Sequence, residues 1–310
     1  MSDVAPALLP AAVVAPPRAM SPMPARWRDY VTLTKPRIMS LLVLTSVCAM
    51  IAAAHGDPSP VRLLALVCGG GLACGGASAL NHVLDRDIDR LMGPRTANRP
   101  VAAGRIAPAR AVAFGLLLLA LAVLVLVAFD NVLAAMLSLA GAGFYVLVYT
   151  VWLKRRTAQN IVIGGAAGAV PPLAGWAAAN GHVGVGAVWL FAIVLLWTPP
   201  HFWALALLLE RRYAAADVPM LPVVRGAAAT ARQILAYSVG LTLLTLAPGF
   251  LGTFGVVYLA AAALLGSALC ALAVRVWREP SPTAASALFH FSLLYLALLF
   301  VSAAVGAGVR

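Results

Sequence analysis

Long apolar runs separated by short polar stretches dominate the chain from about residue 38 to its end. A helix needs about 20 mostly apolar residues to cross roughly 30 Å of hydrocarbon. The split inside 233–274 depends on turn residues alone, among them Pro248 and Gly252. The pattern predicts an all-α, polytopic membrane protein with nine transmembrane helices, near 38–54, 63–80, 111–129, 132–153, 157–181, 183–209, 233–251, 254–274 and 284–307.

The composition agrees with this prediction and adds a boundary. Hydrophobic residues make up 63% of the 310 residues, and the mean hydropathy is +0.95, beyond the range of soluble domains. Residues 1–27 are rich in Ala, Pro and Val and lack the positive start of a signal peptide. We therefore expect a disordered cytoplasmic tail over 1–27 and one transmembrane domain over 28–310.

The net charge of +12 would suit nucleic acid, but its distribution along the chain indicates a membrane orientation instead. If the N-terminus is cytoplasmic, nine spans place 20 of the 22 Lys and Arg residues on the cytoplasmic side, with only Arg62 and Arg310 outside. Cytoplasmic segments of membrane proteins carry such an excess. We expect a multi-pass protein of the cytoplasmic (inner) membrane, with the 81–110 loop in the cytoplasm and no nucleic-acid partner.

The densest polar segment is 81–100, which holds four Arg and three Asp in the sequence NHVLDRDIDRLMGPRTANRP. If the preceding helix continues to about Arg90, then Asn81, Asp85 and Asp89 lie within roughly 80° on one face. Asp87 would belong to another face. Mg²⁺ favours one or two carboxylates together with substrate phosphates, so the spacing predicts a magnesium site at Asn81, Asp85 and Asp89.

Several basic residues are candidates for binding an anion near these carboxylates. Arg95 and Arg99 lie in an irregular loop and could hold phosphate oxygens in a bidentate manner, although lipid headgroups would suit them equally. Lys154 and Arg155 follow the fourth span, where cations also serve topology and the helix dipole. Lys35 precedes the first span, where it would either anchor the chain at the interface or contribute to an anionic site.

The sixth span ends in WTPPHFWALALLLERRY. Pro199 and Pro200 are expected to break this helix beside His201. An intramembrane histidine can contact a metalloporphyrin or carry protons, but a lone histidine near a helix end is also commonly interfacial. Glu210 and Asp217 follow in the next cytoplasmic loop and could form a second, weaker acidic site that faces the first one.

Three motifs together resemble the UbiA superfamily of intramembrane prenyltransferases, and within it the protohaem IX farnesyltransferase (haem O synthase) branch. The resemblance runs from about Tyr30 to the C-terminus and includes LTKPR before the first span. The acidic cluster alone would indicate only the superfamily, whereas the other two motifs are specific to the branch. The motifs are NHVLDRDIDRLMGPRTANRP, YTVWLKRRTAQNIVIGGAAGAVPPLAGWAAANG and LLWTPPHFWALALLLERRYAAADVPMLPVV.

The resemblance implies farnesyl transfer from farnesyl diphosphate to a vinyl group of haem B, with release of diphosphate. The product, haem O, serves terminal oxidases directly or after conversion to haem A, so haem A synthase or a terminal oxidase assembly is an implied partner. The implied fold is nine helices around a central cavity open to the cytoplasmic side. The implied roles are Mg²⁺ binding by Asn81, Asp85 and Asp89, and substrate binding by Lys154, Arg155, Arg95, Arg99, Tyr149 and His201.

The chain departs from the family pattern at one position. An acidic residue commonly precedes the tyrosine that matches Tyr213, but this chain has Arg212 there. The usual second acidic site is therefore in doubt. We hypothesise that Asp217 compensates, with Glu210 as the other possible substitute.

Three other readings of the sequence remain. A prenyltransferase acting on an aromatic acid or a chlorin would keep the acidic cluster without needing TPPHFWALA and PMLPVV. A transporter or channel would suit nine spans with proline breaks, but no pair of broken helices occurs in matching halves of the chain. A non-catalytic haem-binding assembly factor would tolerate loss of Asp85 and Asp89.

Overall fold

The computed structural model describes residues 25–308, and most of the predicted tail, 1–24, lies outside them. Within these residues nine helices are long and apolar enough to cross a membrane, as predicted, and no strand occurs. The spans are α2 (Pro36–Ala53), α3 (Pro60–Leu84), α6 (Pro108–Phe129), α7 (Val132–Gly143) continued by the π-helix η1 (Phe144–Leu153), α8 (Asn160–Asn180), α9 (Val185–Leu208), α11 (Leu221–Phe250), α12 (Gly255–Arg278) and α13 (Pro282–Gly308).

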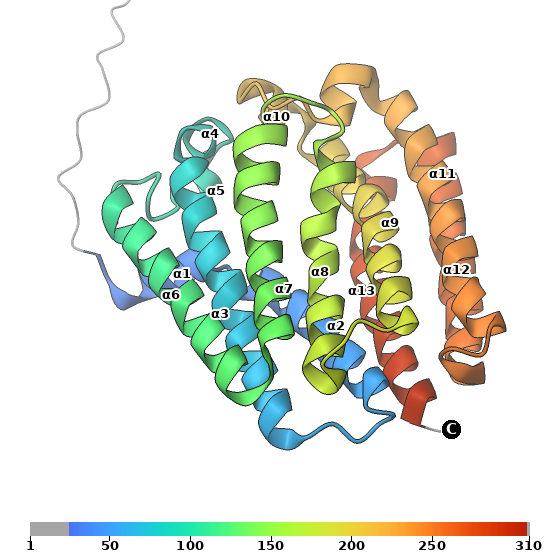
Figure 1. The fold of residues 1–310 in the computed structure, drawn as a ribbon. Helices are drawn as coiled ribbons and strands as arrows, with labels where there is room; N and C mark the ends of the chain where they lie inside the picture. The colour runs from blue at the N-terminus through green and yellow to red at the C-terminus, as the bar shows by residue number, and fades with distance from the viewer. Residues whose placement is uncertain (1–24, 309–310) are drawn as a thin grey trace, which may run out of the picture.

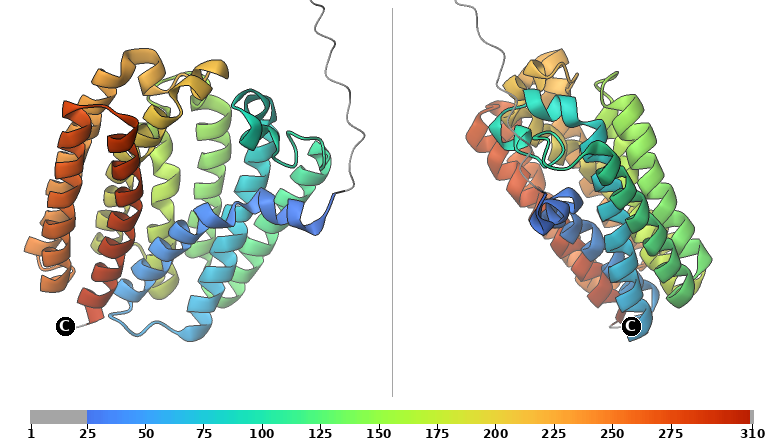
Figure 2. Two further views of the ribbon diagram at one scale, coloured as in Figure 1. Left: turned by 180° about the vertical axis from the view of Figure 1, so that it is seen from behind. Right: turned by 90° about the vertical axis from the view of Figure 1, so that its left-hand side faces the viewer.

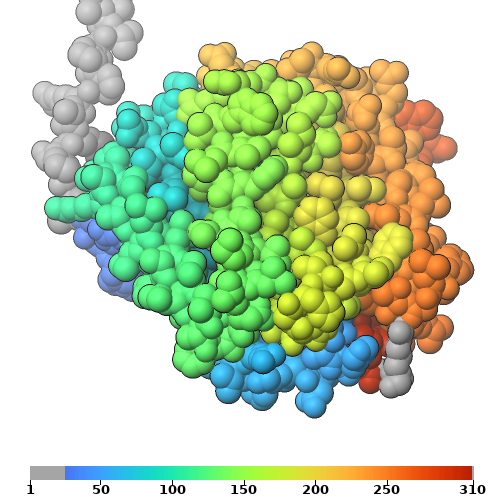
Figure 3. Space-filling model, viewed as in Figure 1, coloured from blue at the N-terminus to red at the C-terminus, as the bar shows by residue number. Residues whose placement is uncertain are grey.

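The spans stand side by side in one bundle (Figure 1). Helix α3 packs mainly on α6, α2 packs on α8 and α13, and α9 packs on α8, α11 and α13. Viewed from behind, α2 and the short α1 (Trp27–Thr34) cross the bundle obliquely (Figure 2). Helices α6 to α9 occupy the middle of the opposite face (Figure 3). Helix α6 exposes leucines such as Leu116 and Leu124. Exposed apolar side chains on a span are suited to contact with lipid.

The predicted boundaries agree with the helices to within a few residues, except at α11. This helix begins at Leu221 instead of 233, and it bends at Gly226, where φ is +74°. The uncertain split between the seventh and eighth spans is confirmed. Gly252 and Gly255 have φ of +71° and +78°, a backbone conformation that glycine adopts without steric cost.

The prediction that Pro199 and Pro200 break the sixth helix was wrong. Helix α9 continues through both prolines to Leu208. Proline fits helical φ and mainly removes a hydrogen-bond donor, and neighbouring helices and Ser or Thr side chains can compensate for that loss in a membrane bundle. Both prolines are buried, and the Thr198 hydroxyl donates to the Val194 carbonyl at 2.8 Å. His201 therefore lies on a continuous helix.

Three short helices connect the spans: α4 (Arg86–Leu91), α5 (Pro94–Ala97) and α10 (Glu210–Ala215). Helices α4 and α10 lie at the same end of the bundle (Figure 1). Ile88 and Met92 of the first loop form one apolar cluster with Ala216 and Val218, which follow α10. This cluster joins the 81–100 segment to the loop after α9.

Helix α3 packs closely on α6. A side chain at Gly76 would lie 2.7 Å from the carbonyl oxygen of Gly115 in α6, so the two backbones are in near contact there. Glycine allows this approach between helices in lipid. The C-terminal end of α3, which carries Asn81, is thereby held in place.

Candidate active site

The acidic cluster forms where α3 ends and α4 begins. The helix does not run without interruption to Arg90, because Asp85 is a turn residue between α3 and α4. The Asp85 amide still donates to the Asn81 carbonyl at 2.9 Å, and the Asp89 amide donates to the Asp85 carbonyl at 2.8 Å. The helical spacing is therefore retained. Asn81, Asp85 and Asp89 are only 2%, 1% and 1% exposed.

The Asn81 side chain links three other residues of the site. Its Nδ2 donates to Asp85 Oδ2 at 2.7 Å and to Thr150 Oγ1 at 3.1 Å, and its Oδ1 accepts from Lys35 Nζ at 2.8 Å. Both ends of the amide are thus engaged. In this arrangement Asn81 orients Asp85, and a direct role of Asn81 as a metal ligand stays a prediction.

Two cations pair with the buried carboxylates. Lys154 Nζ lies 2.5 Å from Asp85 Oδ2, and Arg99 Nη1 lies 2.6 Å from Asp89 Oδ1. The other oxygens, Asp85 Oδ1 and Asp89 Oδ2, are buried and have no hydrogen-bond partner within residues 25–308. Buried carboxylate oxygens are ordinarily paired, so these two are suited to a hard cation. Burial raises the pKa of Asp89, and Arg99 partly offsets this shift.

The π-helix η1 supplies one wall of the site. Thr150 Oγ1 donates to the Tyr145 carbonyl, and the Lys154 amide donates to the Tyr149 carbonyl, both five residues back. The wider turn changes which side chains share a face, and π-helical turns often occur at functional sites. Tyr149 stacks on Tyr145 with ring centroids 5.7 Å apart. Tyr149 also joins the apolar cluster of Ile88, which lies beside the carboxylates.

Lys35 belongs to the site, although the sequence alone did not decide between an interfacial anchor and a contribution to an anionic site. It separates α1 from α2 in a left-handed conformation, with φ of +50°, and its ammonium group reaches Asn81. Burial, with Arg99 and Lys154 nearby, lowers the pKa of Lys35 to about 7. The proline after it, in LTKPR, indicated a helix start, but only the tertiary fold brings this lysine to the cluster.

His82 was not among the predicted site residues. It is buried beside Asn81, and neither ring nitrogen has a hydrogen-bond partner within the described chain. Its position next to the cluster in sequence was the only signal available. Tyr213 packs in the apolar cluster of Ile88 and Met92. Burial, with Tyr149 nearby, raises the pKa of Tyr213 to about 12.

Two other predicted site residues, Arg155 and Arg95, form no ion pair with Asp85 or Asp89 within residues 25–308. Arg155 forms a bidentate pair with Asp87 at 2.6 and 2.7 Å and also donates to the Leu84 carbonyl. The Asp87 side chain is 59% exposed, so this pair is at the surface. The Arg155 hydrogen bonds lower the pKa of Asp87. Arg95 is exposed on α5.

The two residues suggested for a second acidic site do not form a cluster with the first. Glu210 begins α10, and Asp217 is exposed beyond its end with φ of +51°. No group of three or more His, Cys, Asp or Glu side chains with metal-binding geometry occurs in the described part of the chain. Arg212 is exposed close to Gly93. A role for Glu210 or Asp217 stays a prediction.

His201 lies deeper, among aromatic side chains of α9 and α13. It is 6% exposed, and its Nδ1 is 2.7 Å from Ser292 Oγ. The ring stacks on Trp197 and Phe289, with centroids 4.3 and 4.7 Å away. No carboxylate pairs with it among residues 25–308.

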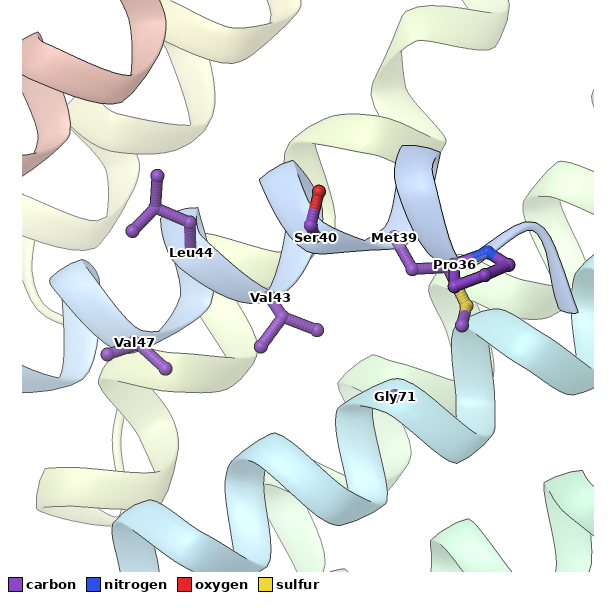
Figure 4. Close-up of a pocket in the computed structure, with 7 residues that line it drawn as sticks. All are labelled: Pro36, Met39, Ser40, Val43, Leu44, Val47 and Gly71. Carbon is purple, nitrogen blue, oxygen red and sulfur yellow. The ribbon is translucent and has the colours of Figure 1, made fainter.

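An apolar groove of about 480 Å³ runs along α2 and is bounded by α3 (Figure 4). Its lining begins at Pro36, directly after Lys35, and continues through side chains one, two and three turns further along α2. Gly71 forms part of the α3 side. The volume is within the range of small-molecule sites.

The groove does not establish the central cavity that the resemblance implies, and that cavity stays a prediction. The residues that line the groove are Pro36, Met39, Ser40, Val43, Leu44, Val47 and Gly71.

Comparison with known proteins identifies the class. The model of the UbiA prenyltransferase family matches residues 42–302. The chain therefore belongs to the UbiA prenyltransferase family and is a prenyltransferase. A structure from work on digeranylgeranylglyceryl phosphate synthase matches with a TM-score of 0.75 and 20% identity, covering 91% of this chain and 99% of that one. A UbiA homologue from Archaeoglobus fulgidus bound to GPP and Mg²⁺ matches with a TM-score of 0.66 and 15% identity, covering 91% and 100%.

More similar relatives carry a narrower name. A protein from Gloeobacter violaceus named protoheme IX farnesyltransferase is 50% identical over 92% of this chain and 93% of its own length. A Roseiflexus protein of the same name is 48% identical over 91% of this chain. The match spans about half (53%) of the Roseiflexus protein.

Proposed function

We propose that this prenyltransferase transfers the farnesyl group of farnesyl diphosphate to a vinyl group of haem B, with water supplying the hydroxyl group of the new side chain, giving haem O and diphosphate. The observation that carries the proposal is the set of buried charges at the end of α3. Asp85 pairs with Lys154 and Asp89 pairs with Arg99, at 2.5 and 2.6 Å. A third cation, Lys35, joins the cluster through Asn81 Oδ1 at 2.8 Å. The names of relatives about 50% identical support farnesyl as donor and haem as acceptor.

The cations hold the diphosphate in this proposal. Breaking an allylic C–O bond leaves added negative charge on the diphosphate, and positioned cations in a water-poor site stabilise that charge strongly. Lys154 and Arg99 are each tied to one carboxylate oxygen, so both are pre-oriented before substrate binds. Lys35 adds charge from the side of α2. Arg95 and Tyr149 would contact the substrate after rearrangement, whereas Arg155, which is held by Asp87, would assist only weakly at the rim.

Asp85 and Asp89 would hold Mg²⁺ through the two unpartnered oxygens, with Asn81 assisting. This donor set fits, because Mg²⁺ binds one or two carboxylates and completes its shell with phosphate and water. When bound, the ion would neutralise charge on the leaving diphosphate. The UbiA homologue bound to GPP and Mg²⁺ supports this assignment. Asp217, with Glu210 as the alternative, would supply the second acidic group in place of the acidic residue absent at Arg212.

The groove along α2 receives the farnesyl chain. It begins beside Lys35 and is lined almost entirely by apolar groups, so a diphosphate on the cluster would lead directly into it. Apolar walls also keep water from the allylic cation until the vinyl carbon attacks. His201 contacts the haem. The 81–100 segment lies on the cytoplasmic side of the inner membrane. Haem A synthase or a terminal oxidase assembly receives the product.

The proposal is tested by mass spectrometry of haem from proteoliposomes that contain the purified protein, haem B, farnesyl diphosphate and Mg²⁺. Haem O should form, and it should be absent with EDTA and with Asp85→Ala. If correctly folded protein makes no haem O, the next candidate is a UbiA prenyltransferase with an aromatic or chlorin acceptor, which a panel of acceptors would identify.

A further inference from the structure

The imidazole ring of His201 is held in one plane by its neighbours. Trp197 and Phe289 stack on its two sides, with interplanar angles of 17° and 22°. Phe202 meets it edge-on at 85°, with centroids 5.0 Å apart. The Trp197 indole also donates to the Ser292 carbonyl at 2.7 Å, which ties α9 to α13 at this level. The ring can therefore present its nitrogens in only a narrow range of directions.

A chain of hydrogen bonds assigns the protons on this ring. Ser292 Oγ lies 2.7 Å from the Phe289 carbonyl oxygen and donates its single proton there. The same Oγ lies 2.7 Å from His201 Nδ1, so it must accept from that nitrogen. Nδ1 carries the proton of the neutral imidazole, and Nε2 carries a free lone pair.

No donor group within the described chain is bonded to the lone pair on Nε2. Nε2 takes part in no hydrogen bond there. It keeps some access to the surface, whereas both ring nitrogens of His82 are fully buried. A histidine that ligates a metal ordinarily donates its other ring N–H to a fixed acceptor, which sets the tautomer and the orientation of the ring. His201 and Ser292 have this arrangement without any metal-binding partner on the protein.

We propose that His201 Nε2 is an axial ligand of the iron in the haem substrate, and that Ser292 is the positioning residue that holds His201 in the required tautomer. This inference rests on the proposed function, because it takes haem as the acceptor. Ligation of the iron by a residue of α9 would fix the macrocycle relative to the bundle and leave its edge, where the vinyl groups are, free to meet the farnesyl carbon. Imidazole is a common axial ligand of haem iron.

The test uses the full-length protein in lipid nanodiscs with haem B and no farnesyl diphosphate, so that binding is observed without turnover. Resonance Raman spectra of the ferrous complex should contain an iron–imidazole stretch. His201→Ala should remove it and weaken haem binding about tenfold or more, and added imidazole should restore the stretch. Ser292→Ala should keep the stretch at an altered frequency, because the hydrogen bond to Nδ1 is lost.

His290→Ala is the matched control. His290 also lies on α13 and contacts a serine, Ser286, but it is exposed, so its loss should leave the spectrum unchanged. The inference is overturned if the wild-type complex has no imidazole stretch, if His201→Ala retains it, or if only His82→Ala removes it. A Ser292→Ala spectrum identical to the wild type overturns the role of Ser292. Haem O formation, assayed separately, tests the proposed function independently of these spectra.

Discussion

Lys154 Nζ and Asp85 Oδ2 are 2.5 Å apart, although 69 residues separate them in the chain. The next residue, Arg155, points instead to the exposed Asp87. Two adjacent cations of one motif therefore have different surroundings. Lys154 is mostly buried and faces the paired carboxylates, whereas Arg155 clamps the outer side of the turn after α3.

This difference predicts unequal effects of two matched substitutions. Lys154→Met should lower kcat/KM for farnesyl diphosphate by about 100-fold, the scale of losing one buried group that stabilises developing charge. Arg155→Met should lower it by less than about threefold, because exposed ion pairs contribute little. Steady-state kinetics on both variants make the comparison. Equal losses would mean that Arg155 leaves Asp87 and grips the diphosphate.

The groove along α2 predicts a change in chain-length preference. A side chain added at Gly71 meets no atom within 4 Å, so Gly71→Leu should fold normally and project into the groove. We expect KM for farnesyl diphosphate to rise about tenfold, with a smaller effect on the shorter geranyl diphosphate. Gly70→Leu is the control, since Gly70 is equally uncrowded but does not line the groove. Identical effects of both substitutions would exclude the groove as the prenyl site.

The hypothesis that Asp217 compensates for Arg212 needs two variants, because the positive φ of Asp217 makes the backbone sensitive to the residue that replaces it. Asp217 has φ of +51°, which asparagine tolerates better than alanine. If its charge supports the metal site, Asp217→Asn and Asp217→Ala should both raise the Mg²⁺ concentration for half-maximal activity, by about tenfold. A defect in the alanine variant alone would indicate backbone strain. Unchanged activity and Mg²⁺ dependence in both would show that Asp217 does not compensate for Arg212.

The burial of Asp130, in the turn before α7, predicts that the stability of the folded protein depends on pH. Burial raises the pKa of Asp130 to about 6, an effect that Arg62 partly offsets, and both carboxylate oxygens lack partners in the described structure. Between about pH 4 and 6 the folded protein holds this proton while the unfolded chain has lost it, so the contribution of Asp130 to stability falls as pH rises.

Asp130→Asn should therefore raise the thermal unfolding midpoint at pH 7.5, and the gain should shrink as pH falls from 6 to 4. Unfolding in detergent across this pH range measures it. Asp57→Asn, at an exposed position of another turn, should show no such trend. A gain for Asp130→Asn that is independent of pH would contradict ionisation of Asp130 as the cause.

The sequence alone determined the number of membrane spans and, except at the start of α11, their bounds to within a few residues, because the bilayer demands long apolar runs, which are visible in one dimension. It also placed Asn81, Asp85 and Asp89 on one helical face, since their spacing is local. The continuity of α9 through Pro199 and Pro200 was not predictable, because packing and side-chain hydrogen bonds from neighbouring turns offset the missing donors.

Only the tertiary structure decided which distant groups meet. Lys35 and Thr150 reach Asn81, and Ser292 assigns the proton on His201, through hydrogen bonds spanning 46 to 91 residues. Such contacts depend on which helices pack together and on the phase of each helix. In η1 that phase follows from a π-helical turn that no hydrophobic pattern reveals.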